Sequence, residues 1–284
     1  MATLYELPGH LLWRASARVA LAVGSALPPG IDLHAYAALL ALAKQEPQSQ
    51  QGLARLTAVS GTTMTAVAEA LGQEGLVARI RNPDDRRSYS LTRTPAGRAA
   101  VREWEPHVTR LEEQLTEPLS EADVARLHAI LLHVVADQLH EDTPAQLLAS
   151  TGFLVVRAQQ RAHREFVAAL EPLGVEPRHF GTLRALQIAG PSTQGGIAGL
   201  LDVSGATVVQ MVDHLEARGL VVRERDATDR RAYRLLITDR GQRLLEAASG
   251  PAVALLADRI GDEQSPTRRD LVRLLRLLLS SPAA

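Results

Sequence analysis

Two copies of the sequence Asp-Arg-Arg-x-Tyr carry the side chains in this chain that are best suited to bind an anionic partner. The copies are Asp85–Tyr89 and Asp229–Tyr233, and each lies between two short extended runs. Such a pattern predicts a β-hairpin with a polar tip. Arginine binds phosphate oxygens through a planar set of N–H donors. We therefore expect the protein to contact an anionic molecule at two places.

The segments around the first hairpin predict four helices before it and two after it. Ser60 is a good N-cap for the helix that precedes the hairpin, and Gly75 is suited to end that helix. Thr94 and Pro95 are suited to start the helix that follows, as N-cap and first helical residue. The expected helices are 8–26, 33–45, 50–58, 61–74, 95–115 and one that starts after Ser120, and the expected strands are 76–80 and 88–91.

The second half of the chain repeats this order at a constant spacing of 144 residues. Within residues 76–98, eleven of 23 positions are identical to the positions 144 residues later: Leu76, Val77, Arg79, Arg81, Asp85, Arg86, Arg87, Tyr89, Leu91, Thr94 and Gly97. We interpret the chain as a duplication, with one unit at residues 1–142 and the other at 143–284. The connection near Thr143 and Pro144 is short, so we expect the halves to be held close.

Two short helices joined by a turn and followed by a two-stranded ribbon form a winged helix-turn-helix. The expected fold class is therefore mainly α with small β-hairpin wings, in two tandem copies. In this arrangement the second helix of the pair can enter the major groove of DNA, with its N-terminal residues toward the bases. The arginines of the ribbon tip can reach the backbone or the adjacent, narrower groove. Double-stranded DNA is the partner that fits both features.

These residues make the chain resemble the MarR family of transcriptional regulators. The resemblance rests on Ser60-Gly61-Thr62-Thr63-Met64-Thr65, on Leu71-x-x-x-Gly75-Leu76-Val77-x-Arg79, and on Asp84-Asp85-Arg86-Arg87 followed by Thr94-x-x-Gly97. The second half repeats it from Ser204 to Gly241. The order of helices and wing covers the whole of both halves.

The resemblance implies a sequence-specific transcriptional regulator, and we expect it to act as a repressor. Family members are usually homodimers of one such unit, joined through their first and last helices on pseudo-palindromic DNA. This chain looks like such a dimer written as one polypeptide. We therefore expect a monomer with internal pseudo-two-fold symmetry, on a pseudo-palindromic or asymmetric operator. The resemblance also implies release by a small aromatic or phenolic inducer.

The residues expected to contact DNA lie on the second helix of each pair and on the wings. In the wings, the resemblance implies that Asp85 and Asp229 orient arginines toward DNA, whereas the alternative is a surface ion pair worth under about 1 kcal/mol. The expected set is Ser60, Thr62, Thr63, Thr65, Arg79, Arg81, Asp85, Arg86 and Arg87 in the first half, and Ser204, Thr207, Gln210, Arg223, Arg225, Asp229, Arg230 and Arg231 in the second.

The outward positions of the two recognition helices lack the basic residues that the family commonly has there. The first half has Ala66 and Ala70, and the second has Gln210 and His214. Base contacts are then expected from threonine and glutamine, and attraction to phosphate from the wings. The alternative is a ligand-binding or protein-interaction module whose affinity for DNA is weak or lost.

An inducer pocket is predicted where arginine, histidine and aromatic residues gather near the first helices of the halves. Arginine and aromatic side chains suit an aromatic acid, and plain packing of the core is the alternative. The residues are His10, Trp13, Arg14, Tyr36, Arg157 and His179. Trp13 corresponds to Arg157 in the repeat, so the two pockets are not expected to be equivalent.

The overall composition limits the other classes of function. Net charge is −1. There are no cysteines, and their absence excludes disulfides and thiolate chemistry. The nine histidines form no His-x-x-x-His pair, so we expect no metal and no cofactor. No phosphate loop or nucleophile elbow is present, so we expect no enzyme. The N-terminus lacks the pattern of a signal peptide and no apolar run is long enough for a membrane span, so we expect a cytoplasmic protein.

Overall fold

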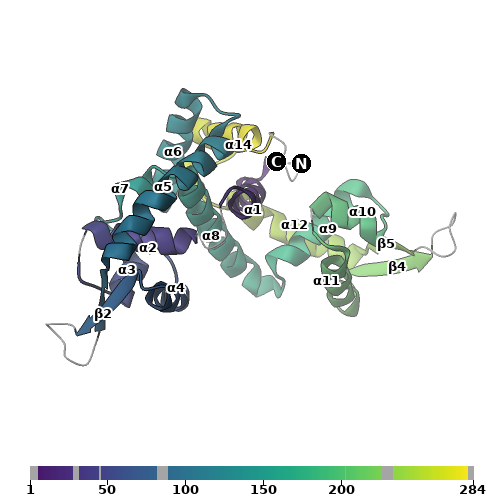
Figure 1. The fold of residues 1–284 in the computed structure, drawn as a ribbon. Coiled ribbons are helices and arrows are strands. Elements are labelled where there is room, and N and C mark those ends of the chain that lie inside the picture. Colours follow the sequence, from purple (N-terminus) through teal and green to yellow (C-terminus); the bar gives the residue numbers. More distant parts are fainter. Residues whose placement is uncertain are drawn as a thin grey trace. The chain divides into compact units, whose positions relative to one another are not determined.

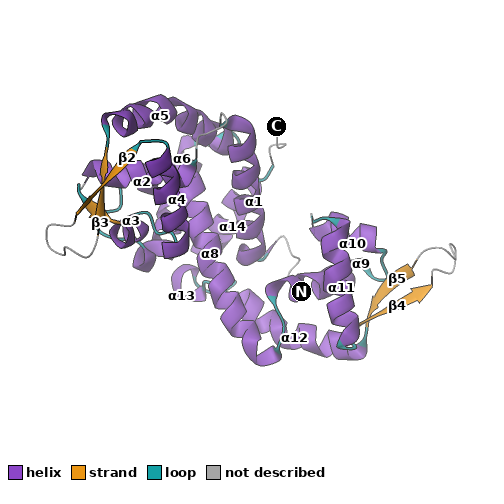
Figure 2. Cartoon of the chain, turned by 60° about the horizontal axis from the view of Figure 1, so that its bottom comes forward, coloured by secondary structure: helices purple, strands orange, loops and turns teal. Residues whose placement is uncertain are grey.

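The computed structural model describes residues 6–27, 32–44, 46–81, 89–201, 203–225 and 233–280. The chain forms two compact units that interleave along the sequence. The N-lobe unit consists of residues 12–159 and 266–284, and the C-lobe unit of residues 1–11 and 160–265. Both units are mainly helical with one small sheet each, as the sequence predicts (Figures 1 and 2). Helices α1 and α8 are each divided between them.

The N-lobe unit contains a winged helix-turn-helix followed by long helices. Its small antiparallel sheet has the strand order β1-β3-β2, and Arg79 of β2 pairs with Leu91 of β3. The elements are α1 (Pro8–Ala26), α2 (Leu33–Lys44), β1 (Gln48–Ser49), α3 (Gln50–Leu56), α4 (Gly61–Gln73), β2 (Val77–Arg81), β3 (Tyr89–Arg93), α5 (Pro95–Thr116), α6 (Glu121–Val135), η2 (Ala136–Gln138), α7 (Ala145–Leu148), the start of α8 (Thr151–Leu170) and α14 (Pro266–Leu278).

The C-lobe unit contains a second winged helix-turn-helix with the same order of elements. Strands β4 and β5 are antiparallel, and Arg223 pairs with Leu235 as Arg79 does with Leu91. A single bridge between Ser192 and Leu235 stands where β1 pairs with β3 in the other unit. The elements after α8 are η3 (Glu171–Leu173), α9 (Pro177–Ala189), α10 (Gln194–Leu201), α11 (Gly205–Ala217), β4 (Val221–Arg225), β5 (Tyr233–Ile237), α12 (Asp239–Ala254) and α13 (Ala257–Ile260).

The turn before each wing is built from the same hydrogen bonds in both units. The Thr94 hydroxyl donates to the carbonyl oxygen of Gly75 at 2.7 Å and accepts from the Gly97 amide at 3.0 Å. Thr238 makes the equivalent bonds at 2.8 and 3.1 Å. Gly75 has a φ of 69°, a left-handed conformation that favours glycine. These bonds join the turn after the recognition helix to the first turn of the helix that follows the wing.

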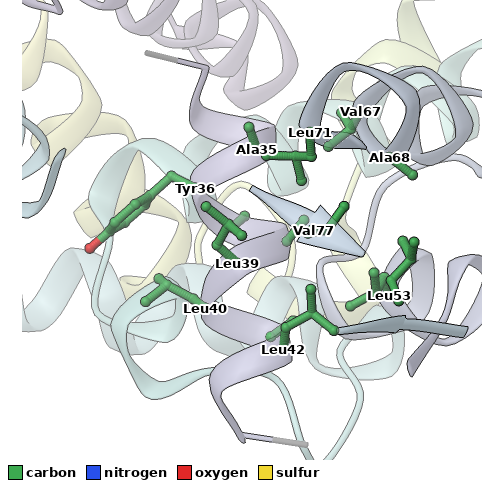
Figure 3. Close-up of a cluster of buried hydrophobic side chains, with 14 of the residues drawn as sticks. Ala35, Tyr36, Leu39, Leu40, Leu42, Leu53, Val67, Ala68, Leu71 and Val77 are labelled. Atoms are coloured by element: carbon green, nitrogen blue, oxygen red, sulfur yellow. The ribbon is translucent and has the colours of Figure 1, made fainter. Parts of the chain in front are cut away.

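The core of the N-lobe unit surrounds α2, which contacts the helices α3, α4 and α5 and the strand β3. Leu39, Leu42, Leu53 and Leu71 are fully or almost fully buried in it (Figure 3). Leu147 of α7 joins the same core, and Thr143 just before it is 2% exposed. The connection between the halves therefore packs against the first lobe rather than forming an open tether.

Three features of the fold are absent from the sequence-based predictions. Strand β1 pairs with β3 in a segment that reads only as a turn. The connection forms the short helices η2 and α7. Helix α12 ends at Ala254, and Leu256, two residues later, has a φ of 63°. The counterpart of α12 in the first half, α5, continues past Pro106 to Thr116. Among the described residues no single helix has the length and apolar composition of a membrane span; only the bent pair α10 and α11, taken together, reaches both.

The close packing of Gly97 gives a prediction about stability. A Cβ atom added there would lie 2.1 Å from the carbonyl oxygen of Leu76, so the backbone would have to move. Gly97→Ala is expected to lower the free energy of unfolding by about 1–3 kcal/mol, measured by urea unfolding followed by circular dichroism. Gly72→Ala is the control, because it adds a Cβ with no atom within 4 Å. Equal stability of the two variants would contradict the prediction.

Candidate nucleic-acid interface

Recognition helix α4 presents a threonine-rich N-terminal turn to solvent. Met64 and Leu71 lie on its buried face, while Thr62 and Thr65 are exposed. The Ser60 hydroxyl caps the helix by accepting from the Thr63 amide at 3.0 Å. Ser60 and Thr63 therefore hold the helix end, and Thr62 and Thr65 are the hydroxyls best placed for contact with bases or phosphate.

Recognition helix α11 repeats the cap but presents different chemistry. The Ser204 hydroxyl accepts from the Thr207 amide at 3.2 Å, as Ser60 does for Thr63. Val209 and Gln210 are exposed in the next positions, Val209 at 39%. Sequence reasoning passed over Val209, although an apolar side chain can contact the methyl group of thymine and glutamine can pair with adenine. Their counterparts in α4 are Thr65 and Ala66.

The arginines of the wing strands differ between the units. Arg79, Arg81 and Arg225 are exposed. Arg223 instead lies against α11, where it donates to Asp213 at 2.5 Å and to Glu216. The position equivalent to Glu216 in the first half is Gly72, so this pair of carboxylates has no full counterpart there. The positive charge of Arg223 is therefore largely neutralised by the recognition helix beside it.

The tips of both wings lie outside the described residues. Asp85, Arg86, Arg87, Asp229, Arg230 and Arg231 all belong to segments 82–88 and 226–232. Their expected contact with DNA rests on the repeated motif alone and stays a prediction. The strands that lead to them are described in both units, and Tyr89 and Tyr233 are exposed at 57% and 50%.

The residues predicted to bind an inducer differ in their surroundings. Trp13 is 37% exposed on α1, and Arg14 beside it is half-buried. Tyr36 is buried in the core, and burial, with a smaller effect of Glu105, raises the pKa of its hydroxyl. Arg157 is 5% exposed, with its guanidinium 5.7 Å from the Phe153 ring centre. Tyr36 and Arg157 are thus buried, while Trp13 is accessible.

In the C-lobe unit His10 is half-buried and His179 is buried. The ring of His179 stacks on that of His214 of α11 at 4.2 Å, nearly parallel. Burial, with a further effect from His214, lowers the pKa of His179 to about 4. His179 is therefore neutral at pH 7, and its ring packs against the recognition helix α11. Its expected part in an inducer pocket stays a prediction.

The stack predicts that the C-lobe unit loses stability in mild acid. Unfolded His179 binds a proton near pH 6.5 and the folded residue only near pH 4, so the free energy of unfolding falls as the pH drops through this window. The share of His179 is about 3 kcal/mol at pH 4. His179→Gln should remove that share from the pH dependence measured by urea unfolding, whereas His133→Gln, at an exposed position, should leave it. Parallel curves for wild type and His179→Gln would contradict this.

A groove of about 740 Å³ lies in the N-lobe unit beside the first turn of α4. Helix α3 forms one wall and the start of the connection between the halves forms the other. None of the residues predicted to bind an inducer lines it. The lining includes Gln51, Arg55, Thr65, Asp137, Gln138 and His140.

Comparison with known proteins identifies the two lobes. A MarR family model matches residues 31–89 and a second MarR family model matches residues 173–232. A Thauera aromatica protein named as a transcriptional regulatory protein for the hcr operon is 32% identical over 112 residues, covering 39% of this chain and 65% of that protein. The repressor NicR of Pseudomonas putida is 30% identical over 145 residues, which are 50% of this chain and 89% of NicR.

Two solved structures of CouR are similar to about half of this chain. CouR of Rhodococcus jostii RHA1 bound to p-coumaroyl-CoA and the repressor CouR bound to a 23-mer DNA duplex each have 32% sequence identity and a TM-score of 0.43. Each comparison covers 48% of this chain and 94% of the CouR chain. With family models in both lobes and NicR covered over most of its length, this chain belongs to the MarR family of transcriptional regulators, with two winged-helix units in tandem.

Proposed function

We propose that this protein is a repressor that binds double-stranded DNA as a covalent pseudo-dimer, one half on each half of its operator. The observation that supports this best is the presence of two complete winged helix-turn-helix lobes in one chain, each with a capped recognition helix and a wing. Paired units of this kind bind half-sites about one helical turn (~34 Å) apart. A single chain then supplies the two DNA-binding units that the two subunits of a homodimer supply. It acts in the cytoplasm, where the DNA is found.

The operator is proposed to be asymmetric, because the two recognition helices offer different side chains. Thr65 and Ala66 of α4 stand where α11 has Val209 and Gln210. Gln210 can form hydrogen bonds with adenine, and Val209 can contact the thymine methyl group. Ala66, the counterpart of Gln210, has no side-chain group that forms hydrogen bonds. A homodimer cannot prefer such a site, since both of its halves are identical.

The experiment that tests DNA binding is a titration of the promoter region beside the protein's own gene at several salt concentrations. Binding that weakens steeply with salt, and is tighter than binding to unrelated duplex, is the expected result. Equal affinity for both duplexes would contradict a sequence-specific regulator. Absence of binding to either would favour the second candidate function, a ligand-binding or protein-interaction module. That candidate draws support from Arg223, whose charge is taken up by Asp213 and Glu216.

We also propose that an aromatic acid releases the DNA by binding near Trp13 and Arg14. The accessible indole of Trp13 suits the ring of such a ligand, and an arginine in the same turn of α1, Arg14, suits its carboxylate. Because the other tryptophan, Trp104, is 8% exposed, quenching of fluorescence by salicylate should come mainly from Trp13 and disappear in Trp13→Phe. Saturable quenching that persists in Trp13→Phe would place the ligand elsewhere.

A further inference from the structure

Within the N-lobe unit, helices α6 and α14 contact each other through residues that are equivalent in the duplication. Four buried apolar residues of α6 each have a buried counterpart 144 residues later on α14. The pairs are Leu127 with Leu271, Ile130 with Leu274, Leu131 with Leu275, and Val134 with Leu278. The last helices of the two halves therefore use the same face to meet.

At one position of this contact a residue meets its own repeat counterpart. Arg126 Nε donates to Asp270 Oδ2 at 2.9 Å, and the two positions are 144 residues apart. A position that faces its own equivalent lies at a local two-fold axis. If the two helices were identical, this position would bring two like charges together. Here it brings opposite charges together.

A second ion pair exists on one side of this axis only. Arg273 donates to Asp123 at 2.8 Å, and this hydrogen bond is the main cause that holds the pKa of Asp123 below its usual value. The repeat counterparts of Asp123 and Arg273 are Thr267 and Ala129, which cannot form an ion pair. The two helices have therefore diverged in charge while their apolar faces stayed equivalent.

We propose that these charges make the contact selective, so that α6 takes α14 as its partner and disfavours a second copy of itself. Two α6 helices meeting in the same way would place Arg126 against Arg126 and lose the ion pair of Asp123. Two α14 helices would place Asp270 against Asp270. Like charges in direct contact cost stability, and a matched pair specifies the partner. Burial of the apolar residues stabilises the contact, and the charged residues favour the α6–α14 pair over an α6–α6 or α14–α14 pair.

The test is a charge-reversal cycle on the full chain. Arg126→Asp and Asp270→Arg each create a like-charge contact, and each is expected to lower Tm by roughly 2–4 °C. The double variant restores opposite charges in reverse order and should regain most of the loss. The differences should shrink in high salt, because both side chains are partly exposed. Arg269→Asp, an equal charge change at the exposed neighbour of Asp270, is the control and should leave Tm nearly unchanged.

Two results would overturn the proposal: single reversals that leave Tm at the wild-type value, or a double variant whose loss equals the sum of the single losses. An equivalent cycle with Asp123→Arg and Arg273→Asp repeats the test at the second pair. The inference rests on the pseudo-dimer proposed above, but Tm is read without DNA. If the charge-reversal cycle gives the expected Tm values but the chain binds no DNA, the proposed regulator function is refuted and the inference about the contact still holds.

Discussion

Alanine at both Arg87 and Arg231 is expected to weaken DNA binding roughly 10- to 100-fold, for all sequences alike. The two residues occupy the same place in the repeated wing motif and are the donors expected to reach the phosphates. Each phosphate contact that is lost leaves one counterion fewer to be released, so the slope of log affinity against log salt should fall by about two. Fluorescence anisotropy of labelled duplex at several salt concentrations measures both quantities.

The control for this experiment removes two arginines elsewhere. Arg110 on α5 and Arg269 on α14 are exposed and lie outside the wings and recognition helices. Their double alanine variant changes the net charge equally and should change affinity little. If the wing variant keeps the affinity and salt slope of the wild type, the wings do not contact DNA. In that case DNA binding would have to come from the side chains of the recognition helices.

Removing the carboxylates that hold Arg223 is expected to strengthen DNA binding about tenfold. Asp213→Asn with Glu216→Gln removes two negative charges from the recognition helix and frees the guanidinium for phosphate. The gain should appear on unrelated duplex as well as on the operator, and the salt slope should steepen by about one. The same anisotropy titration measures it.

The first half provides the matched control for that gain. Glu69 is the counterpart of Asp213, it is exposed, and Gly72 replaces the second carboxylate. Glu69→Gln therefore removes a negative charge from α4 without releasing an arginine from two partners, and its gain should be distinctly smaller. Equal gains in the two variants would mean that only the charge of the helix matters and that Arg223 has no role.

Much of each lobe could be predicted from sequence because its signals are local. Ser60, Gly75 and Thr94 set the ends of helices through bonds to residues within a few positions or to the adjacent turn. The buried face of α4 follows from spacing alone. The duplication extends these local signals to the second half, where Ser204, Gly219 and Thr238 behave in the same way.

What could not be predicted depends on contacts between elements. Arg223 looked equivalent to Arg79 until the end of α11 was placed beside β4 with two carboxylates. The stacking of the His179 ring on that of His214 joins residues far apart in the sequence, so no local pattern predicts it. Arg126 and Asp270 look like ordinary surface charges in the sequence, and their meaning appears only when α6 lies against α14. Tertiary pairing of this kind leaves no periodic signal.

The most direct test of the proposed function is the mass of the protein bound to a duplex that carries one complete operator. A covalent pseudo-dimer predicts one 30.6 kDa chain for each duplex, with two protected major-groove segments about one helical turn (~34 Å) apart. Native mass spectrometry gives the stoichiometry and footprinting gives the two segments. Two chains on one operator, with each chain protecting a single segment, would contradict the account.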